Sequence, residues 1–166
     1  MEFELKSLSK AAIPSALERA KGYRMFNEPA QAESICLDIL QVDPDNQQAI
    51  ITLLLALADQ FSESIIDNLD RAWSLLPDIH DEYQRAYYNG LLYERQARIY
   101  LRRGTPGSSH AAYDLFREAM RCYETAERTR PKGNDEALLR WNTCARAIMT
   151  GRLQPQPLED FSPMFE

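Results

Sequence analysis

Apolar residues recur at helical spacing along most of this chain. After Pro29 they follow the i, i+3, i+4, i+7, i+8 pattern of an amphipathic helix that faces a core. The residues in this pattern are Ala32, Ile35, Cys36, Ile39 and Leu40. From about residue 47 to 61 apolar residues occupy nearly every side, which predicts a helix packed between neighbours. No segment has the strict alternation of a strand, so the pattern predicts an all-α protein.

Proline, glycine and polar clusters divide this pattern into about seven predicted helices. Five of the breaks fall at Asn27–Pro29, Asp43–Asn46, Pro77–Asp81, Gly104–Ser109 and Pro131–Asn134, and a sixth boundary precedes the helix expected from about Ser64. Two of the predicted helices are long, over residues 82–103 and 109–130. Residues 152–166 contain three prolines and no period. We therefore expect one helical domain over residues 1–151 and an extended, proline-rich acidic tail over 152–166.

The order of small, aromatic and proline positions resembles the roughly 34-residue tetratricopeptide repeat (TPR). Tyr23, Ala32 and Pro44 have the family spacing, and Pro77 follows Pro44 by 33 residues. A third copy ends at Pro131, 54 residues after Pro77, so its helices, its loop or both are longer than usual. The resemblance implies about three degenerate repeats and a capping helix. It further implies an α-solenoid, a right-handed superhelical array of antiparallel helix pairs.

In such an array each helix pair buries its apolar face on its neighbours, and small residues lie where helices approach most closely. Five alanines suit these contacts. They are Ala20, Ala32, Ala97, Ala119 and Ala126. We expect all five to be buried.

Charge is distributed unevenly over a chain whose net charge is −6. Residues 1–83 hold 6 Lys and Arg against 15 Asp and Glu, whereas residues 84–152 hold 13 against 7. An acidic N-terminal half and a basic C-terminal half can steer an anionic partner to the basic half. No apolar run approaches the roughly 20 residues of a membrane span, and Met1–Lys10 lacks the apolar core of a signal peptide. We expect a cytoplasmic protein whose three cysteines are small core residues and form no disulfide framework.

The sequence carries no pattern that predicts catalysis, a cofactor or a metal site. The two histidines, His80 and His110, have no metal-ligand spacing and are expected at the surface. Phosphate-binding glycine loops, dinucleotide fingerprints and nucleophile elbows are missing from the sequence. We therefore expect a binding protein that is not an enzyme.

If the TPR register applies, the exposed side of the first helix in each repeat lines a concave groove that holds a peptide. The candidate groove residues are Leu17, Lys21, Arg24, Ile51, Leu55, Asp59, Glu94, Arg98, Leu101 and Arg102. This surface would be apolar at its centre and mainly basic at both ends, which suits an extended acidic and hydrophobic segment. The alternative is that the helix over 82–103 covers Ile51 and Leu55 and leaves no open groove.

The expected partner is therefore a protein or peptide, and two further roles stay open. One is a chaperone for a secreted substrate, similar to type III secretion chaperones, and the other is a non-catalytic regulatory subunit of an enzyme. The acidic and aromatic segment Leu158–Glu166 is itself a candidate ligand, in cis or in a homodimer. Leu17 and Lys21 do not match the two-carboxylate clamp for chaperone tails. Nucleic acid is disfavoured because the net charge is negative and the tyrosines of 93–103 fall at core positions.

Overall fold

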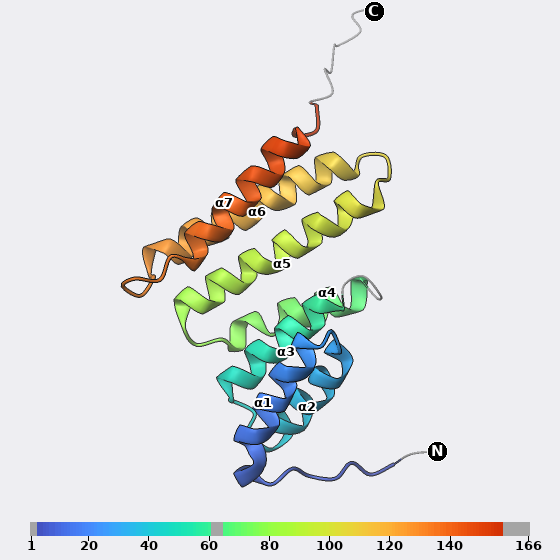
Figure 1. Ribbon diagram of the computed structural model, residues 1–166, viewed down its shortest axis with the longest axis vertical. Helices are drawn as coiled ribbons and strands as arrows, with labels where there is room; N and C mark the ends of the chain where they lie inside the picture. Colours follow the sequence, from blue (N-terminus) through green and yellow to red (C-terminus); the bar gives the residue numbers. More distant parts are fainter. Residues whose placement is uncertain (1–2, 61–64, 158–166) are drawn as a thin grey trace, which may run out of the picture.

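The computed structural model describes residues 3–60 and 65–157, and this part of the chain forms seven α-helices, two short 3₁₀ helices and no strand. The helices are α1 (Ile13–Met25), α2 (Pro29–Val42), α3 (Gln47–Asp59), α4 (Ile65–Ser74), α5 (Glu82–Arg103), α6 (Ser108–Arg128) and α7 (Glu136–Gly151), with η1 (Lys10–Ala12) and η2 (Leu76–Asp78). Figure 1 shows the short helices α1–α4 at one end of an elongated molecule and the longer α5–α7 at the other. The all-α prediction is confirmed over these residues.

The helix ends follow the predicted breaks, and three of these breaks supply a residue that caps a helix. The Asn46 side chain accepts a hydrogen bond from the Ala49 amide at the start of α3, and Asp81 does the same for Gln84 at the start of α5. Gly104 ends α5 with a φ of +59°, a conformation in which glycine is favoured. The extra length predicted before Pro131 lies in α5 and α6, of 22 and 21 residues, because only 104–107 separate them.

Helices α1–α4 and one face of α5 enclose an aliphatic core, which we call the N-terminal core. Its buried members include Ile50, Leu53, Leu54 and Leu57 of α3. The prediction that α3 is packed between neighbours is confirmed, since eight of its residues are buried. Leu92 and Ile99 of α5 belong to the same cluster.

Helices α5–α7 enclose a second core, the C-terminal core, which is rich in aromatic residues. Phe116 and Tyr123 of α6 are completely buried in it. Gly90 of α5 lies so close to α6 that an added Cβ would be 2.8 Å from Cε1 of Tyr123. Contacts are most extensive between α5 and α6, and because α5 contributes to both cores it joins the two halves of the molecule.

The five alanines expected at close helix contacts are all completely buried. Cys36 and Cys144 are also completely buried, and Cys122 is half-buried, with all three thiols free. These observations agree with the prediction that the cysteines act as small core residues.

The chain leaves α7 without further helix over residues 153–157. Leu153 packs against the C-terminal core, and the carbonyl oxygen of Gln154 accepts a hydrogen bond from His110 Nδ1 at 2.8 Å. The rest of the predicted tail, including the candidate ligand Leu158–Glu166, lies outside the described residues. None of the described helices is both long enough and apolar enough to span a membrane.

Candidate functional site

The principal candidate site is a polar cleft between the two halves of the molecule, where α5 faces the C-terminal ends of α1 and α3. Its volume is about 490 Å³. We call it the arginine cleft, because four of its nine lining residues are arginines. The lining residues are Asn27, Ala58, Asp59, Glu94, Arg95, Arg98, Ile99, Arg102 and Arg140.

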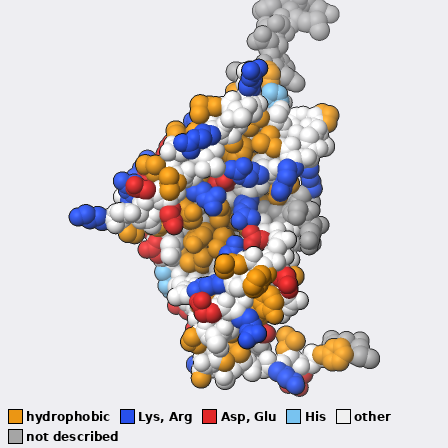
Figure 2. All heavy atoms as spheres, in the orientation of Figure 1, with side chains coloured by type: hydrophobic (Ala, Val, Ile, Leu, Met, Phe, Trp, Pro, Cys, Tyr) orange, Lys and Arg blue, Asp and Glu red, His pale blue; other side chains and the backbone are white. Residues whose placement is uncertain are grey.

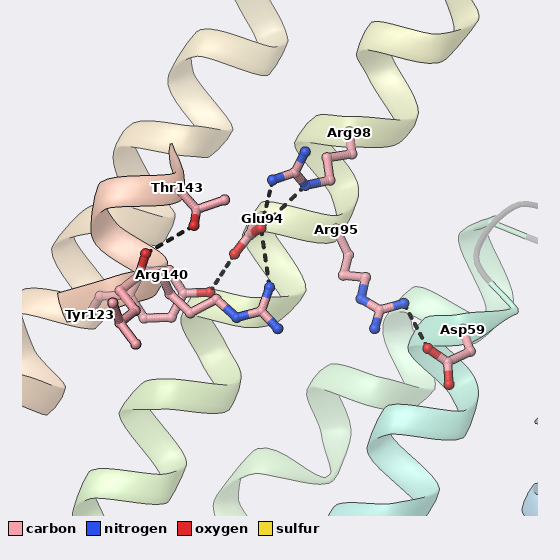
Figure 3. A network of polar contacts seen from close by, with 8 residues as sticks. Asp59, Glu94, Arg95, Arg98, Tyr123, Arg140 and Thr143 are labelled. Carbon is pink, nitrogen blue, oxygen red and sulfur yellow. Dashed lines mark hydrogen bonds and ion pairs between the residues drawn. The ribbon is translucent and has the colours of Figure 1, made fainter. Parts of the chain in front are cut away.

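A buried carboxylate, Glu94, forms one wall of the arginine cleft and gathers side chains from three helices (Figure 3). The hydroxyl of Tyr123 donates to its Oε2 at 2.9 Å. Its Oε1 accepts from Arg98 Nε at 3.2 Å and Nη2 at 3.0 Å, and from Arg140 Nη1 at 3.4 Å. The Glu94 side chain is 2 % exposed, whereas the two arginines are 44 % and 40 % exposed. Glu94 therefore anchors two guanidinium groups that remain partly accessible.

A second carboxylate, Asp59 at the end of α3, lies on the opposite wall. Its Oδ1 accepts from Arg95 Nη1 at 2.7 Å, and its Oδ2 accepts from Arg24 Nε at 2.8 Å. Arg95 reaches Asp59 from α5, so this ion pair links the two halves across the cleft (Figure 3). Each oxygen of Asp59 already has a charged donor.

The arginine cleft carries an excess of positive charge. Its lining holds four guanidinium groups and two carboxylates, and Arg24 adds a further positive charge through Asp59. Arg102 also lines the cleft, and it has no ion pair with any residue in the described part of the chain. Figure 2 shows Lys and Arg side chains gathered over the middle of one face of the molecule, with hydrophobic side chains beside them. This arrangement favours an anionic ligand.

The surroundings of Glu94 raise the pKa values of three neighbouring side chains, so that none of them titrates near neutral pH. Burial, together with the charge of Glu94 and the hydrogen bond to it, raises the pKa of the Tyr123 hydroxyl. Burial, followed by the charge of Glu94, raises the pKa of the Cys144 thiol to about 12. Burial would lower the pKa of the Arg140 guanidinium, but the neighbouring Tyr87 hydroxyl and Glu94 carboxylate raise it overall. Arg140 therefore stays charged, and Tyr123 and Cys144 stay neutral, at physiological pH.

Of the basic residues predicted for the groove, the structure brings three together at the arginine cleft. Arg98 and Arg102 line it, and Arg24 lies against it through Asp59. Lys21 lies elsewhere, with its Nζ 2.8 Å from Glu18 and 3.3 Å from Gln48.

The apolar residues predicted for the groove do not line the arginine cleft. Leu17 is buried against Ile39 and Ala49, and its edge borders a shallower hollow between the first turns of α1 and α3. Ile51 and Leu55 are half-buried and pack against the N-terminal core. They are thus only partly covered. Leu101 is exposed on α5, outside the cleft lining.

Two arginines of the cleft lining, and the tyrosine that donates to Glu94, were not among the groove residues expected from sequence. Arg95 lies on the turn of α5 between Glu94 and Arg98, and its long side chain reaches back to α3. Arg140 comes from α7, and Tyr123 fits the helical period of a core residue. No local signal links these positions to Glu94, because the contacts depend on how α6 and α7 pack against α5.

The fold and the cleft define the class of this protein as an all-helical protein with an arginine-rich polar cleft. No protein-family model matches the chain, and comparisons with the curated proteins and with the solved structures found no match.

Proposed function

We propose that this protein is a non-enzymatic interaction module that holds an extended acidic and hydrophobic segment of another polypeptide. The arginine cleft is the observation that carries this proposal, because it concentrates partly exposed guanidinium groups in one concave place. Arginine binds carboxylates through paired, charge-assisted hydrogen bonds, which are stronger than bonds between neutral groups.

The architecture we propose for the module is a TPR-like array of helix pairs with α7 as the capping helix. Helices α1, α2 and α3 have 13, 14 and 13 residues, and each packs on the next along the chain. The complete burial of the five alanines supports the close helix approach that such an array requires. In this arrangement the arginine cleft belongs to the concave groove.

Exposed apolar residues next to the cleft support a ligand that is hydrophobic as well as acidic. Met25 and Phe26 precede the cleft residue Asn27 and are 87 % and 78 % exposed. Leu101 is exposed beside Arg102 on α5. A segment with apolar side chains on either side of a carboxylate could contact both kinds of surface.

The proposal places the protein in the cytoplasm and assigns it binding without catalysis. Its three free thiols suit a reducing compartment. The pKa shifts around Glu94 keep Tyr123 and Cys144 neutral and Arg140 charged, which suits charge recognition better than proton transfer.

A displayed peptide library tests this function and defines the sequences that the cleft selects. The protein and its Arg98→Glu/Arg102→Glu variant are each used to select peptides. We expect the unchanged protein to enrich peptides with Asp or Glu next to aliphatic or aromatic residues, and the variant to lose that enrichment. Arg103→Glu/Arg117→Glu is the matched control, because it makes the same change in charge at residues outside the cleft lining. Identical selections by all three proteins would rule out the cleft as the binding site.

A synthetic peptide with the sequence of Leu158–Glu166 gives a direct second probe, since that segment is acidic and aromatic. A chain that ends at Gly151 should bind this peptide, and added salt should weaken the binding. Absence of binding at millimolar peptide would exclude the tail as a ligand and leave the library result to identify the partner segment.

A further inference from the structure

The two carboxylates of the arginine cleft bind their arginines in different ways, and the difference decides how much positive charge remains for a ligand. Asp59 accepts one arginine on each of its oxygens. Glu94 instead holds Arg98 and Arg140 on the single atom Oε1. Arg102 lies one helical turn beyond Arg98 and lines the same cleft. Glu94 is therefore the one carboxylate beside three guanidinium groups, two of which it binds, and this end of the cleft has a charge of about +2.

These three arginines retain donors for a ligand. A guanidinium group has five N–H donors, and Arg98 uses its Nε and Nη2 for Glu94 while Arg140 uses its Nη1. Both side chains remain close to half exposed at the cleft. A group with several acceptor oxygens can therefore bind without displacing Glu94.

We propose that Arg98, Arg102 and Arg140 form a subsite for one dianionic oxyanion, the phosphoryl group of a phosphorylated serine or threonine in the bound segment. This inference rests on the proposed binding function and specifies its ligand. A phosphoryl group carries about −1.5 to −2 charges at pH 7 and three strong acceptor oxygens, which match a subsite of charge +2. One carboxylate would leave a positive charge unpaired and would offer one oxygen fewer.

Glu94 acts in this subsite as a positioning residue. Its side chain is buried and fixed by the Tyr123 hydroxyl, so its Oε1 presents a fixed acceptor to Arg98 and Arg140. Guanidinium groups that are already held in place lose less conformational freedom when the ligand binds. Glu94 therefore strengthens binding, although its own negative charge repels the ligand.

The surroundings favour a peptide over a nucleic acid as the carrier of the phosphoryl group. Binding of single strands usually combines phosphate contacts with aromatic side chains on which bases stack. The cleft lining contains no aromatic residue among those the structure describes, and Tyr87, Tyr93 and Tyr100 pack against the C-terminal core.

Fluorescence anisotropy with three labelled peptides tests the subsite. The peptides share one sequence with leucine and phenylalanine around a central phosphoserine, serine or glutamate, and a twelve-residue oligothymidylate is the fourth probe. We expect the full-length protein to bind the phosphoserine peptide about tenfold more tightly than the glutamate peptide. The serine peptide should bind more weakly than both.

Arg102→Ala should reduce the ratio of phosphoserine to glutamate affinity several-fold, and Arg103→Ala, one residue further along α5 and outside the cleft lining, should leave it unchanged. Glu94→Gln should lower the same ratio, whereas a general loss of folded protein would weaken both peptides equally. Retention of the full ratio in Arg102→Ala would overturn the subsite.

The outcomes separate this inference from the function on which it rests. Equal binding of the phosphoserine and glutamate peptides would overturn the phosphoryl subsite and leave the acidic-segment function standing. No binding of any peptide would count against both. Tighter binding of the oligothymidylate than of the phosphoserine peptide would overturn the assignment to a polypeptide.

Discussion

The N-terminal half of this molecule (α1–α4) and its C-terminal half (α5–α7) bury their interiors with different chemistry. The N-terminal core is largely aliphatic, with isoleucine, leucine and alanine from α3 at its centre. The C-terminal core is built around Phe116 and Tyr123, with further tyrosines and Trp141 packed against it. The charged side chain of Glu94 is buried beside this second core.

This difference explains why most of the charged residues of the candidate site come from the C-terminal half. Aliphatic side chains can be packed without any polar partner, but a buried tyrosine needs one for its hydroxyl. Tyr123 satisfies its hydroxyl on Glu94, and Glu94 satisfies its other oxygen on Arg98 and Arg140. These hydrogen bonds connect the aromatic core to the charged side chains at the surface of the cleft.

The largest expected effects come from replacing one large buried side chain in each core by alanine. Phe116→Ala should lower the free energy of unfolding by about 3–5 kcal/mol and Leu54→Ala by about 2–5 kcal/mol, since both side chains are completely buried. The two tryptophans give one probe for each half, with Trp73 in α4 and Trp141 in α7. Urea titrations followed by fluorescence of single-tryptophan variants measure both halves.

Either substitution should move both tryptophan midpoints together, because α5 supplies Leu92 to the N-terminal core and Ala97 to the C-terminal core. Midpoints that separate would show that the halves unfold independently and that α5 does not couple them.

Loss of the buried charge should have the next largest effect. Glu94→Gln should lower the free energy of unfolding by about 1–3 kcal/mol, since hydrogen bonds to a buried charged group are weakened while Arg98 and Arg140 turn towards solvent. Asp59→Asn is the matched variant at the opposite wall, where the carboxylate is 18 % exposed against 2 % for Glu94, so its loss should cost at most about 1 kcal/mol. Chemical denaturation of both variants compares them, and equal losses would contradict the role of Glu94 as the buried anchor.

Replacing one glycine in each half by alanine should change the stability of the protein in opposite directions. Gly90→Ala places a Cβ 2.8 Å from the Tyr123 ring, which is completely buried and bonded through its hydroxyl to Glu94, so we expect a net loss of about 1–2 kcal/mol despite the higher helix propensity of alanine. Gly22→Ala in α1 meets no atom within 4 Å and should stabilise the protein by about 0.5–1 kcal/mol. Thermal unfolding monitored by circular dichroism measures both, and a stabilised Gly90→Ala protein would show that α5 and α6 can move apart.

The last comparison concerns the buried thiols, whose ionisation has no effect on stability at neutral pH. Burial raises the pKa of Cys36 in the N-terminal half and of Cys144 in the C-terminal half from 9.0 to about 12. A raised pKa in the folded state means that the thiol's contribution to stability is complete below pH 9 and is lost as the pH rises towards 12. Urea midpoints between pH 8 and 11 should fall less steeply for Cys36→Ala and for Cys144→Ala than for the unchanged protein. Unchanged slopes would contradict the burial of the ionisable thiols.

Much of the helical structure could be predicted because its signals are local. Asn46 and Asp81 cap the helices that follow them, Gly104 ends α5, and apolar residues on nearly every side identified α3 as a packed helix. The five alanines could be expected at close contacts because small side chains allow helix axes to approach. The proposed TPR register went further and placed Arg98 and Arg102 on one face, since they are four residues apart on one helix.

The remaining features of the cleft depend on contacts between distant segments. Arg140 reaches Glu94 only because α7 packs against α6 and α6 packs against α5. Leu17, expected in a groove, is instead buried because the beginning of α3 lies against it. The helical period could not distinguish these outcomes, since a residue on one face of a helix faces whichever neighbour the tertiary structure provides.

The sequence by itself thus determined the helices, where they end and the charge of each half, because propensity, capping and periodicity act over a few residues. The tertiary structure alone decided that one buried carboxylate would hold arginines from α5 and α7 beside a tyrosine from α6. Burial of Glu94 and its distance from each partner depend on the packing of three helices, and no property of an isolated segment fixes them.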